Sequence, residues 1–313
     1  MNTPDLTLAL ATRSRLTDNR PSGYLTRTLQ RLHGILPPKT NIIVMDASPP
    51  GETHDELHAF HARTGDWMTV RPRPRPPVRD DEARALIPAA RLATLPEEEI
   101  TWGVQITRDF VDLMRMAAED KASCILRIED DVYAAKDLVS SAIQAIQRHP
   151  NRPFVSLFSP RIRLDGQTTT YHCHAQAIIF RNDSTLIELI RHVESLDGQN
   201  LFDVLMATFQ SSSGHHGIVS YPSLVQHLGV TRSQPGSPPR EPLVSPTFRS
   251  QPPHWPLLRP IQLAWKQMLR WLAMRADGQA RYSPFNSASI SSRASVMSTE
   301  ASFCTLFVPS QVS

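Results

Sequence analysis

The sequence predicts an α/β fold in which a mostly parallel central sheet carries helices on both faces. Short apolar runs of strand length alternate with segments whose apolar residues recur every three or four positions. The first unit of this kind comprises a strand over 6–11, a loop over 12–23, a helix over 24–36 and a strand over 41–46. Units of this order build parallel sheets whose ligands bind at the carboxyl ends of the strands.

The first helix shows both a buried face and an end. Leu25, Leu29, Leu32 and Leu36 are spaced so that they fall on one face, which can pack on the sheet. Pro37 then ends the helix, because proline lacks the backbone N–H and its ring clashes with the preceding turn.

Later segments repeat the alternation of helix and strand. Residues 102–119 place apolar side chains at helical spacing, and 124–128 is an apolar run of strand length. Residues 71–78 alternate Arg with Pro, which favours an extended, solvated loop over a partner-binding Pro motif. The other predicted helices are 52–64, 137–147 and 184–195, and the other predicted strands are 68–70, 154–158 and 175–180.

The composition changes toward the carboxyl terminus, where prolines recur over 235–260 and serines over 283–302. We therefore expect one globular domain over 5–233 and a Pro/Ser-rich tail over 234–313. Within the tail, 261–275 has an apolar helical stripe opposed by basic and amide side chains. Packing back on the domain and peripheral contact with a membrane surface both explain this stripe.

The overall charge and the cysteine content narrow the classes of function. With 33 Lys and Arg against 30 Asp and Glu and no aromatic-studded basic stripe, the chain is not expected to bind nucleic acid. It has no basic stretch followed by a long apolar run, so we expect neither a signal peptide nor a transmembrane segment. Cys124, Cys173 and Cys304 are too few and too far apart for a disulfide framework.

Three consecutive carboxylates, Glu129, Asp130 and Asp131, follow directly on the apolar strand. Like charges repel, and a carboxylate near a core is costly unless it is paired. A divalent cation relieves both problems, because oxygen ligands suit Mg²⁺ and Mn²⁺. Such an ion can stabilise charge on the phosphates of a bound nucleotide. A solvated acidic turn is the alternative for these residues.

Four stretches of the chain occur in the order of one family's motifs. Residues 11–13 with 23–32 resemble its opening strand, donor loop and first helix, and 102–110 resembles the helix before its acidic motif. Residues 125–132 resemble its Leu-Glu-Asp-Asp segment, a DxD-type motif, and 221–229 is similar to its Pro-Ser-Leu-Phe-Gln-His signature. The family is that of N-acetylglucosaminyltransferase IV and the related GPI-mannose GalNAc transferase, post-GPI-attachment factor four.

The resemblance spans roughly residues 6–233 and implies a GT-A glycosyltransferase domain over 5–233. It implies an inverting enzyme that uses Mn²⁺ or Mg²⁺ to move GlcNAc or GalNAc from a UDP-sugar. The acceptor would be a hydroxyl of a glycan or glycolipid, such as an N-glycan or a GPI glycan. Members of the family work in the Golgi lumen, usually tethered by an N-terminal membrane segment. This chain begins almost at its first strand, so we expect a truncated chain or a soluble relative.

The resemblance assigns a metal centre to the acidic motif. Asp131, with Glu129 or Asp130 beside it, would hold the ion and the diphosphate of the donor. His227, in the Gln-His-x-Gly part of the signature, would complete the metal site, since imidazole is a common ligand of transition metals. Without the resemblance, a lone His in an apolar stretch indicates a packed core residue.

The same resemblance assigns donor contacts and a base. Thr12 and Arg13, after the first strand, would contact the nucleotide, because a planar guanidinium suits phosphate and base contacts. Asp203 lies where the family has an acidic residue at the start of a helix, and it would take the proton of the acceptor hydroxyl. A solvated Arg13 and a helix-capping Asp203 are the alternatives.

The chain departs from the family over 172–177, where bulky side chains replace a glycine-rich strand, so the acceptor stays open. His172 and His174 share a strand face there, without an evident second pair of zinc ligands. Two competing classes are a catalytically degenerate module that binds sugar or nucleotide or scaffolds partners, and a metal-dependent phosphoryl-transfer enzyme. The second normally needs a phosphate-binding Gly-rich loop or Lys, which is not seen in this sequence.

Overall fold

The computed structural model of the protein describes residues 5–14, 16–17, 20–21, 23–160, 166–169, 175–228, 245 and 247–248. The side chains of residues 16–17, 20–21, 98, 167–169 and 203 are outside this description. The chain divides into two compact units, Met1–Pro260 and Ile261–Ser313, and every element named below belongs to the first. The predicted tail helix over 261–275 and the pair His172 and His174 lie outside the described residues.

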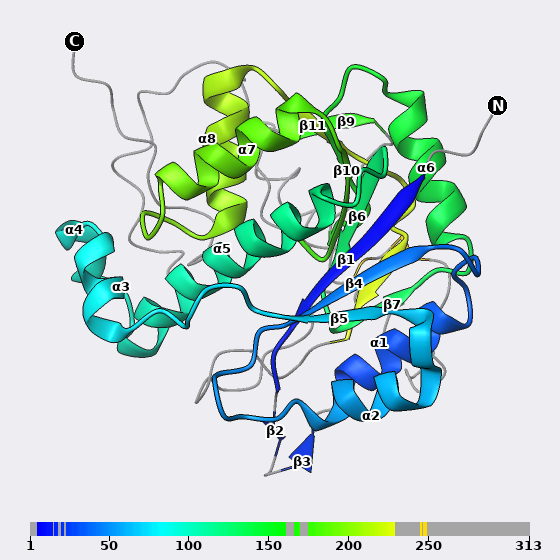
Figure 1. The fold of residues 1–313 in the computed structure, drawn as a ribbon. Coiled ribbons are helices and arrows are strands. Elements are labelled where there is room, and N and C mark those ends of the chain that lie inside the picture. The colour runs from blue at the N-terminus through cyan, green and yellow to red at the C-terminus, as the bar shows by residue number, and fades with distance from the viewer. Residues whose placement is uncertain are drawn as a thin grey trace, which may run out of the picture. The chain divides into compact units, whose positions relative to one another are not determined.

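In the described part of the chain, eight strands form a central sheet in the order β5-β4-β1-β6-β10-β8-β11-β9 (Figure 1). Strands β9 and β10 run antiparallel to their neighbours, and the remaining pairs are parallel. The predicted α/β class with a mostly parallel sheet is therefore confirmed. The strands are β1 (Leu6–Thr12), β4 (Asn41–Asp46), β5 (Thr69–Pro72), β6 (Cys124–Ile128), β8 (Phe154–Ser156), β9 (Gln167–Thr169), β10 (Ala177–Arg181) and β11 (Gly217–Val219).

Helices cover both faces of this sheet, as predicted. Strand β1 shows how two cores arise, because successive side chains of a strand point to opposite faces. Leu8 and Leu10 pack in one apolar cluster with α1, α2 and α6, whereas Ala9 packs in a second with α5, α7 and α8. The helices are α1 (Tyr24–His33), α2 (Asp55–Thr64), α5 (Glu97–Ala118), α6 (Leu138–Arg148), α7 (Ser184–Ser195) and α8 (Phe202–Ser213).

Several element boundaries differ from the predicted ones: α1 ends at His33 with Gly34 as its C-cap rather than at Pro37, and α2 begins at Asp55 rather than at residue 52. The largest difference is at the start of α5. This helix begins at Glu97 rather than near residue 102, and the acidic residues of its first turn suit the positive end of a helix dipole. The sequence pattern also missed two short helices, α3 (Asp80–Leu86) and α4 (Ala89–Leu92). Among the described residues, no helix combines the length with the apolar character that crossing a bilayer requires.

The Arg-Pro segment is not the solvated loop that the sequence predicted. Its first residues form β5, and the Arg73 side chain, only 6% exposed, makes a two-point ion pair with Asp109 of α5. The Arg73 Nε–Asp109 Oδ1 and Nη2–Oδ2 distances are 2.8 and 3.1 Å. Arg75 pairs in the same way with Asp112, one helical turn further on. The alternating arginines therefore fasten the segment to α5.

Residues near the carboxyl end of the first unit contact the region of the 221–229 signature. The Ser245 hydroxyl donates to Ser223 Oγ at 2.7 Å, and the Ser245 amide donates to Gln226 Oε1 at 3.2 Å. Phe248, 4% exposed, packs edge to face on Tyr133. These contacts lie beyond residue 233, where the composition places the end of the domain. A Pro-rich composition does not reveal them, because they depend on a few residues only.

The buried ion pair between the Arg-Pro segment and α5 predicts a large loss of folding stability when Arg73 is substituted. Arg73→Ala should lower the free energy of unfolding by about 3 kcal/mol, because it leaves the buried Asp109 carboxylate without its cationic partner. Arg79→Ala is the control, since the Arg79–Asp81 pair is about three-quarters exposed on both sides and contributes little. Urea unfolding measures both losses, and equal losses would contradict the buried role of Arg73.

The contacts of Ser245 and Phe248 predict that residues after 233 stabilise the domain. A chain ending at Ser250 should be more stable than one ending at Ser233 by roughly 2 kcal/mol, the contribution of a buried Phe side chain. Thermal unfolding of the two truncated chains makes the comparison. Identical melting midpoints would show that the contacts of this segment add nothing to stability.

Candidate metal centre

The acidic turn lies at the carboxyl ends of three neighbouring parallel strands. Strand β1 pairs with β6 on one side and with β4 on the other, and Thr12 at the end of β1 is opposite Asp46 at the end of β4. The apolar residues of β6 are buried, so the strand ends inside the molecule and the acidic turn follows it there. This edge of the sheet is where parallel α/β folds bind ligands.

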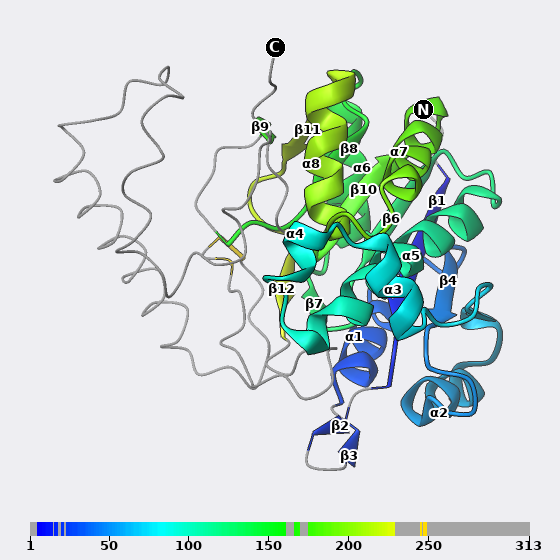
Figure 2. The same ribbon diagram turned by 90° about the vertical axis from the view of Figure 1, so that its left-hand side faces the viewer.

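A second, small sheet brings His227 to the acidic turn. Strand β7 (Val132–Ala134) follows the turn directly and pairs antiparallel with β12 (Val225–His227), beside which it lies in Figure 2. In this register His227 is opposite Val132. The amide of Leu228 donates to the carbonyl oxygen of Asp131 at 2.7 Å and fixes the two segments together. The signature and the acidic motif therefore meet in space.

Glu129, Asp131 and His227 each offer a ligand atom, and these three atoms lie within 4.8 Å of one another. His227 Nε2 is 3.3 Å from Asp131 Oδ2, and the two side chains are 17% and 7% exposed. Two carboxylates and an imidazole form a donor set that suits Mn²⁺. The structure thus brings together the residues that the resemblance assigned to the metal, and their role as ligands stays a prediction.

The electrostatics of the cluster also fit a cation. Burial raises the pKa of the Glu129 carboxyl; Arg127 and His227 oppose this rise, and the charges of Asp131 and Asp130 add to it. Arg127 Nη1 lies 3.6 Å from Glu129 Oε1 and offsets part of the negative charge. A divalent ion placed among the carboxylates would favour their ionised form.

Asp130 points away from this cluster. Its carboxylate accepts a hydrogen bond of 2.8 Å from the Thr12 hydroxyl, and its carbonyl oxygen accepts one of 2.9 Å from the Thr28 hydroxyl. Its exposed fraction is 4%. The carboxylate of Asp130 is therefore held by β1 and its backbone by α1, and Asp130 is not among the three candidate metal ligands.

Thr12 and Arg13 lie where the sequence predicted them, at the end of β1. The Thr12 hydroxyl is buried between Asp130 and His54, whose Nε2 lies 3.0 Å from it. Arg13 follows directly and is half-buried. Their contacts with a nucleotide stay predictions.

Asp203 is the second residue of α8, and Leu201 occupies the N-cap position. The side chain of Asp203 is outside the described part of the structure, so its role as the base stays a prediction. Its neighbour Phe202 stacks on Phe110 and lies 5.0 Å from the guanidinium of Arg127. The beginning of α8 is thereby tied to the strand that leads into the acidic turn.

Sequence reasoning missed two residues of this region. Arg127 could have been found from the sequence, because it is the one charged residue in the strand Cys-Ile-Leu-Arg-Ile. No sequence feature identifies His54, since it stands alone in a polar stretch between a strand and a helix. Only the fold brings it to Thr12.

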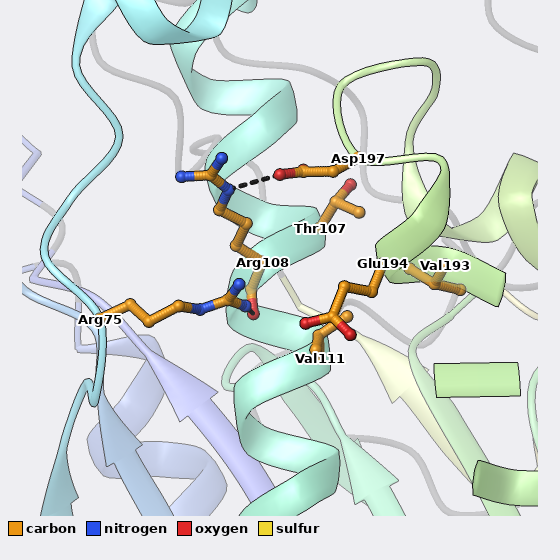
Figure 3. Close-up of a pocket in the computed structure, with 7 residues that line it drawn as sticks. All are labelled: Arg75, Thr107, Arg108, Val111, Val193, Glu194 and Asp197. Carbon is orange, nitrogen blue, oxygen red and sulfur yellow. Dashed lines mark hydrogen bonds and ion pairs between the residues drawn. The ribbon is translucent and has the colours of Figure 1, made fainter. Parts of the chain in front are cut away.

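A small hollow between α5 and α7 lies among residues other than the predicted site residues. Its lining includes Arg75 and Arg108, and Figure 3 shows Arg108 bonded to Asp197. Arg108 lies 2.6 Å from both Asp197 and Glu82, and Arg75 is paired with Asp112. Because the arginines of this hollow already have carboxylate partners, it offers no free cation for an anionic ligand.

Comparison with known proteins gives distant structural likenesses. No family model matches the chain, and no curated protein matches it. A mannosyltransferase from Pyrobaculum calidifontis, solved with GDP-Man and Mn²⁺, matches at 14% identity and a TM-score of 0.45 over 90% of this chain and 77% of that one. TarS of S. aureus (1–349) matches at 11% identity and a TM-score of 0.39 over 71% and 59%. With TM-scores below 0.5, these likenesses do not by themselves assign a function.

The three-residue cluster predicts direct binding of Mn²⁺. Loss of even a residue that supports a metal ligand costs about 10- to 100-fold in affinity, so we expect Asp131→Asn to lose at least as much. Asp137→Asn is the matched control, because Asp137 is the next carboxylate along the chain and bonds only to α6 in its described contacts. Calorimetric titration measures the Mn²⁺ affinity of both variants, and equal affinities would show that Asp131 is not a ligand of the ion.

Proposed function

We propose that the protein is a metal-dependent glycosyltransferase of GT-A type that transfers a sugar from a nucleotide-sugar donor. One observation carries the proposal: Glu129, Asp131 and His227 converge at the carboxyl ends of parallel strands. They come from the two stretches of sequence that resemble the acidic motif and the terminal signature of the family. A solvated acidic turn does not account for the approach of His227 or for the burial of Asp131.

Different residues in and around the cluster would bind the ion and the nucleotide of the donor. Glu129, Asp131 and His227 would hold the ion, which supplies positive charge that stabilises the departing diphosphate. Thr12 and Arg13, at the end of β1, would orient the nucleotide beside it. The half-buried guanidinium of Arg13 is suited to phosphate or base contacts through its planar N–H groups.

The finer chemistry follows from the sequence resemblance. It favours UDP-GlcNAc or UDP-GalNAc as the donor, a hydroxyl of a glycan or glycolipid as the acceptor, and inversion in a single displacement. In that reaction Asp203 takes the proton of the acceptor hydroxyl as the new glycosidic bond forms and the bond to the diphosphate breaks. The position of Asp203 at the start of α8, next to Phe202 and its contact with Arg127, supports this role.

The second candidate function is a module that binds the nucleotide sugar without transferring it. It shares the metal centre with the first candidate and differs in lacking the base. A donor screen separates the two, using UDP-GlcNAc, UDP-GalNAc, UDP-Gal, UDP-Glc and GDP-Man with Mn²⁺ or with EDTA. Mn²⁺-dependent binding with slow donor hydrolysis supports the transferase, and binding without any turnover supports the module.

Variants of two aspartates separate donor binding from proton removal. Asp131→Asn should weaken Mn²⁺-dependent binding of the donor, because it removes a ligand of the ion. Asp203→Asn should leave that binding intact and abolish transfer to the acceptor, because a general base acts only in the chemical step. Glu188→Gln, an exposed carboxylate on α7, is the control for both measurements. Full transfer by Asp203→Asn would mean that another carboxylate is the base.

A further inference from the structure

A buried chain of hydrogen bonds lies behind the acidic turn. Thr12 Oγ1 is 2.8 Å from Asp130 Oδ2, and His54 Nε2 is 3.0 Å from Thr12 Oγ1. The three residues come from the end of β1, the N-cap position of α2 and the turn after β6, and their exposed fractions are 2%, 2% and 4% for Thr12, His54 and Asp130. Water does not compete for these hydrogen bonds in the folded protein.

The chemistry of the groups fixes the direction of the chain. The Thr12 hydroxyl donates to Asp130 Oδ2, and a hydroxyl carries only one proton to donate. The Thr12 oxygen must then accept a hydrogen bond from His54, which places the imidazole proton on Nε2. Burial lowers the pKa of His54, which agrees with a neutral ring of this tautomer.

The Thr28 hydroxyl secures the same turn from the opposite side. Its oxygen lies 2.9 Å from the carbonyl oxygens of both Asp130 and Val132, which share its proton, and it accepts a bond of 3.2 Å from the Val132 amide. The side chain of Asp130 is thus held through β1 and its backbone through α1. Because Asp130 stands between Glu129 and Asp131, holding it fixes the backbone from which both candidate metal ligands project.

We propose that His54 is a positioning residue of the metal centre, acting through Thr12 on Asp130. It holds the acidic turn in the arrangement that lets Glu129, Asp131 and His227 meet, and it contacts neither ion nor substrate. This inference deepens the proposed function and rests on it, since the centre that His54 positions is the one proposed there.

The other nitrogen of His54 argues against a purely space-filling role. Nδ1 is buried and has no hydrogen-bond partner in the described part of the structure. An unsatisfied buried nitrogen is costly, whereas an apolar side chain of similar volume would fill the same space without that cost. What the imidazole adds over an apolar residue is the hydrogen bond from Nε2 to Thr12.

Two substitutions of His54 test the proposal against a purely structural role. His54→Leu keeps the apolar volume and removes the donor, whereas His54→Gln keeps an N–H group at a similar distance from the backbone. We expect the dissociation constant for Mn²⁺ to rise about tenfold in His54→Leu, at the low end for residues that support metal ligands. His54→Gln should recover most of this loss. His61→Leu, on the same helix, is the matched control and should bind Mn²⁺ as the wild type does.

A double variant tests whether His54 acts through Thr12. Thr12→Val removes the hydroxyl at nearly constant shape and breaks the chain at its middle. If the two residues form one chain, His54→Leu with Thr12→Val loses no more Mn²⁺ affinity than the larger single loss. If the losses of Mn²⁺ affinity in the two single variants add in the double variant, His54 does not act through Thr12 and the proposal is overturned.

A second measurement does not depend on metal. The nitrogen NMR shifts of the imidazole should show the proton of His54 on Nε2 in the wild type and should change in Thr12→Val. A proton on Nδ1, or a folded His54→Leu with unchanged Mn²⁺ affinity, would overturn the proposal. If the wild type binds no Mn²⁺, the proposed function fails first, and the NMR shifts still decide whether the hydrogen-bond chain exists.

Discussion

The repulsion among three consecutive carboxylates at the end of a buried strand is the constraint on which the site depends. The fold gives each of them a different partner. Glu129 lies near the guanidinium of Arg127, Asp130 accepts from Thr12, and Asp131 lies against His227. Even so, burial raises the pKa of Glu129. These partners leave the three carboxylates crowded where the strand ends converge, and a cation bound there would favour their ionised forms.

The segments that surround the acidic turn and supply its partners are far apart in sequence. Parallel pairing of β1, β4 and β6 puts the ends of these strands together, and β12 returns to pair with β7 immediately after the turn. Ser245 then contacts Ser223, in the loop that precedes β12, and Gln226, within β12 itself. The position of His227 thus depends on pairing within the small sheet and on contacts made well after it in the chain.

The sequence was sufficient for those parts of the fold that follow from local periodicity or from a motif. Strand β1, helix α1 and the acidic turn could be predicted, and the resemblance brought in His227. Long-range polar contacts could not be predicted: an Arg-Pro alternation looks solvated, and only the fold shows that Arg73 meets Asp109. His54 is similar, because its partner Thr12 lies on another element and no spacing connects them. Burial raises the pKa of Asp109 even though the adjacent Arg73 opposes the rise.

The Arg-Pro segment has a further consequence for the behaviour of the protein in solution. Strand β5 is one outer strand of the sheet, and outer strands present unpaired backbone groups on which another chain can add. Pro72 has no amide hydrogen to offer, and the following residues leave the sheet to follow α5. Pro72 therefore limits strand addition at the same edge of the sheet where Arg73 and Arg75 fasten the chain to α5.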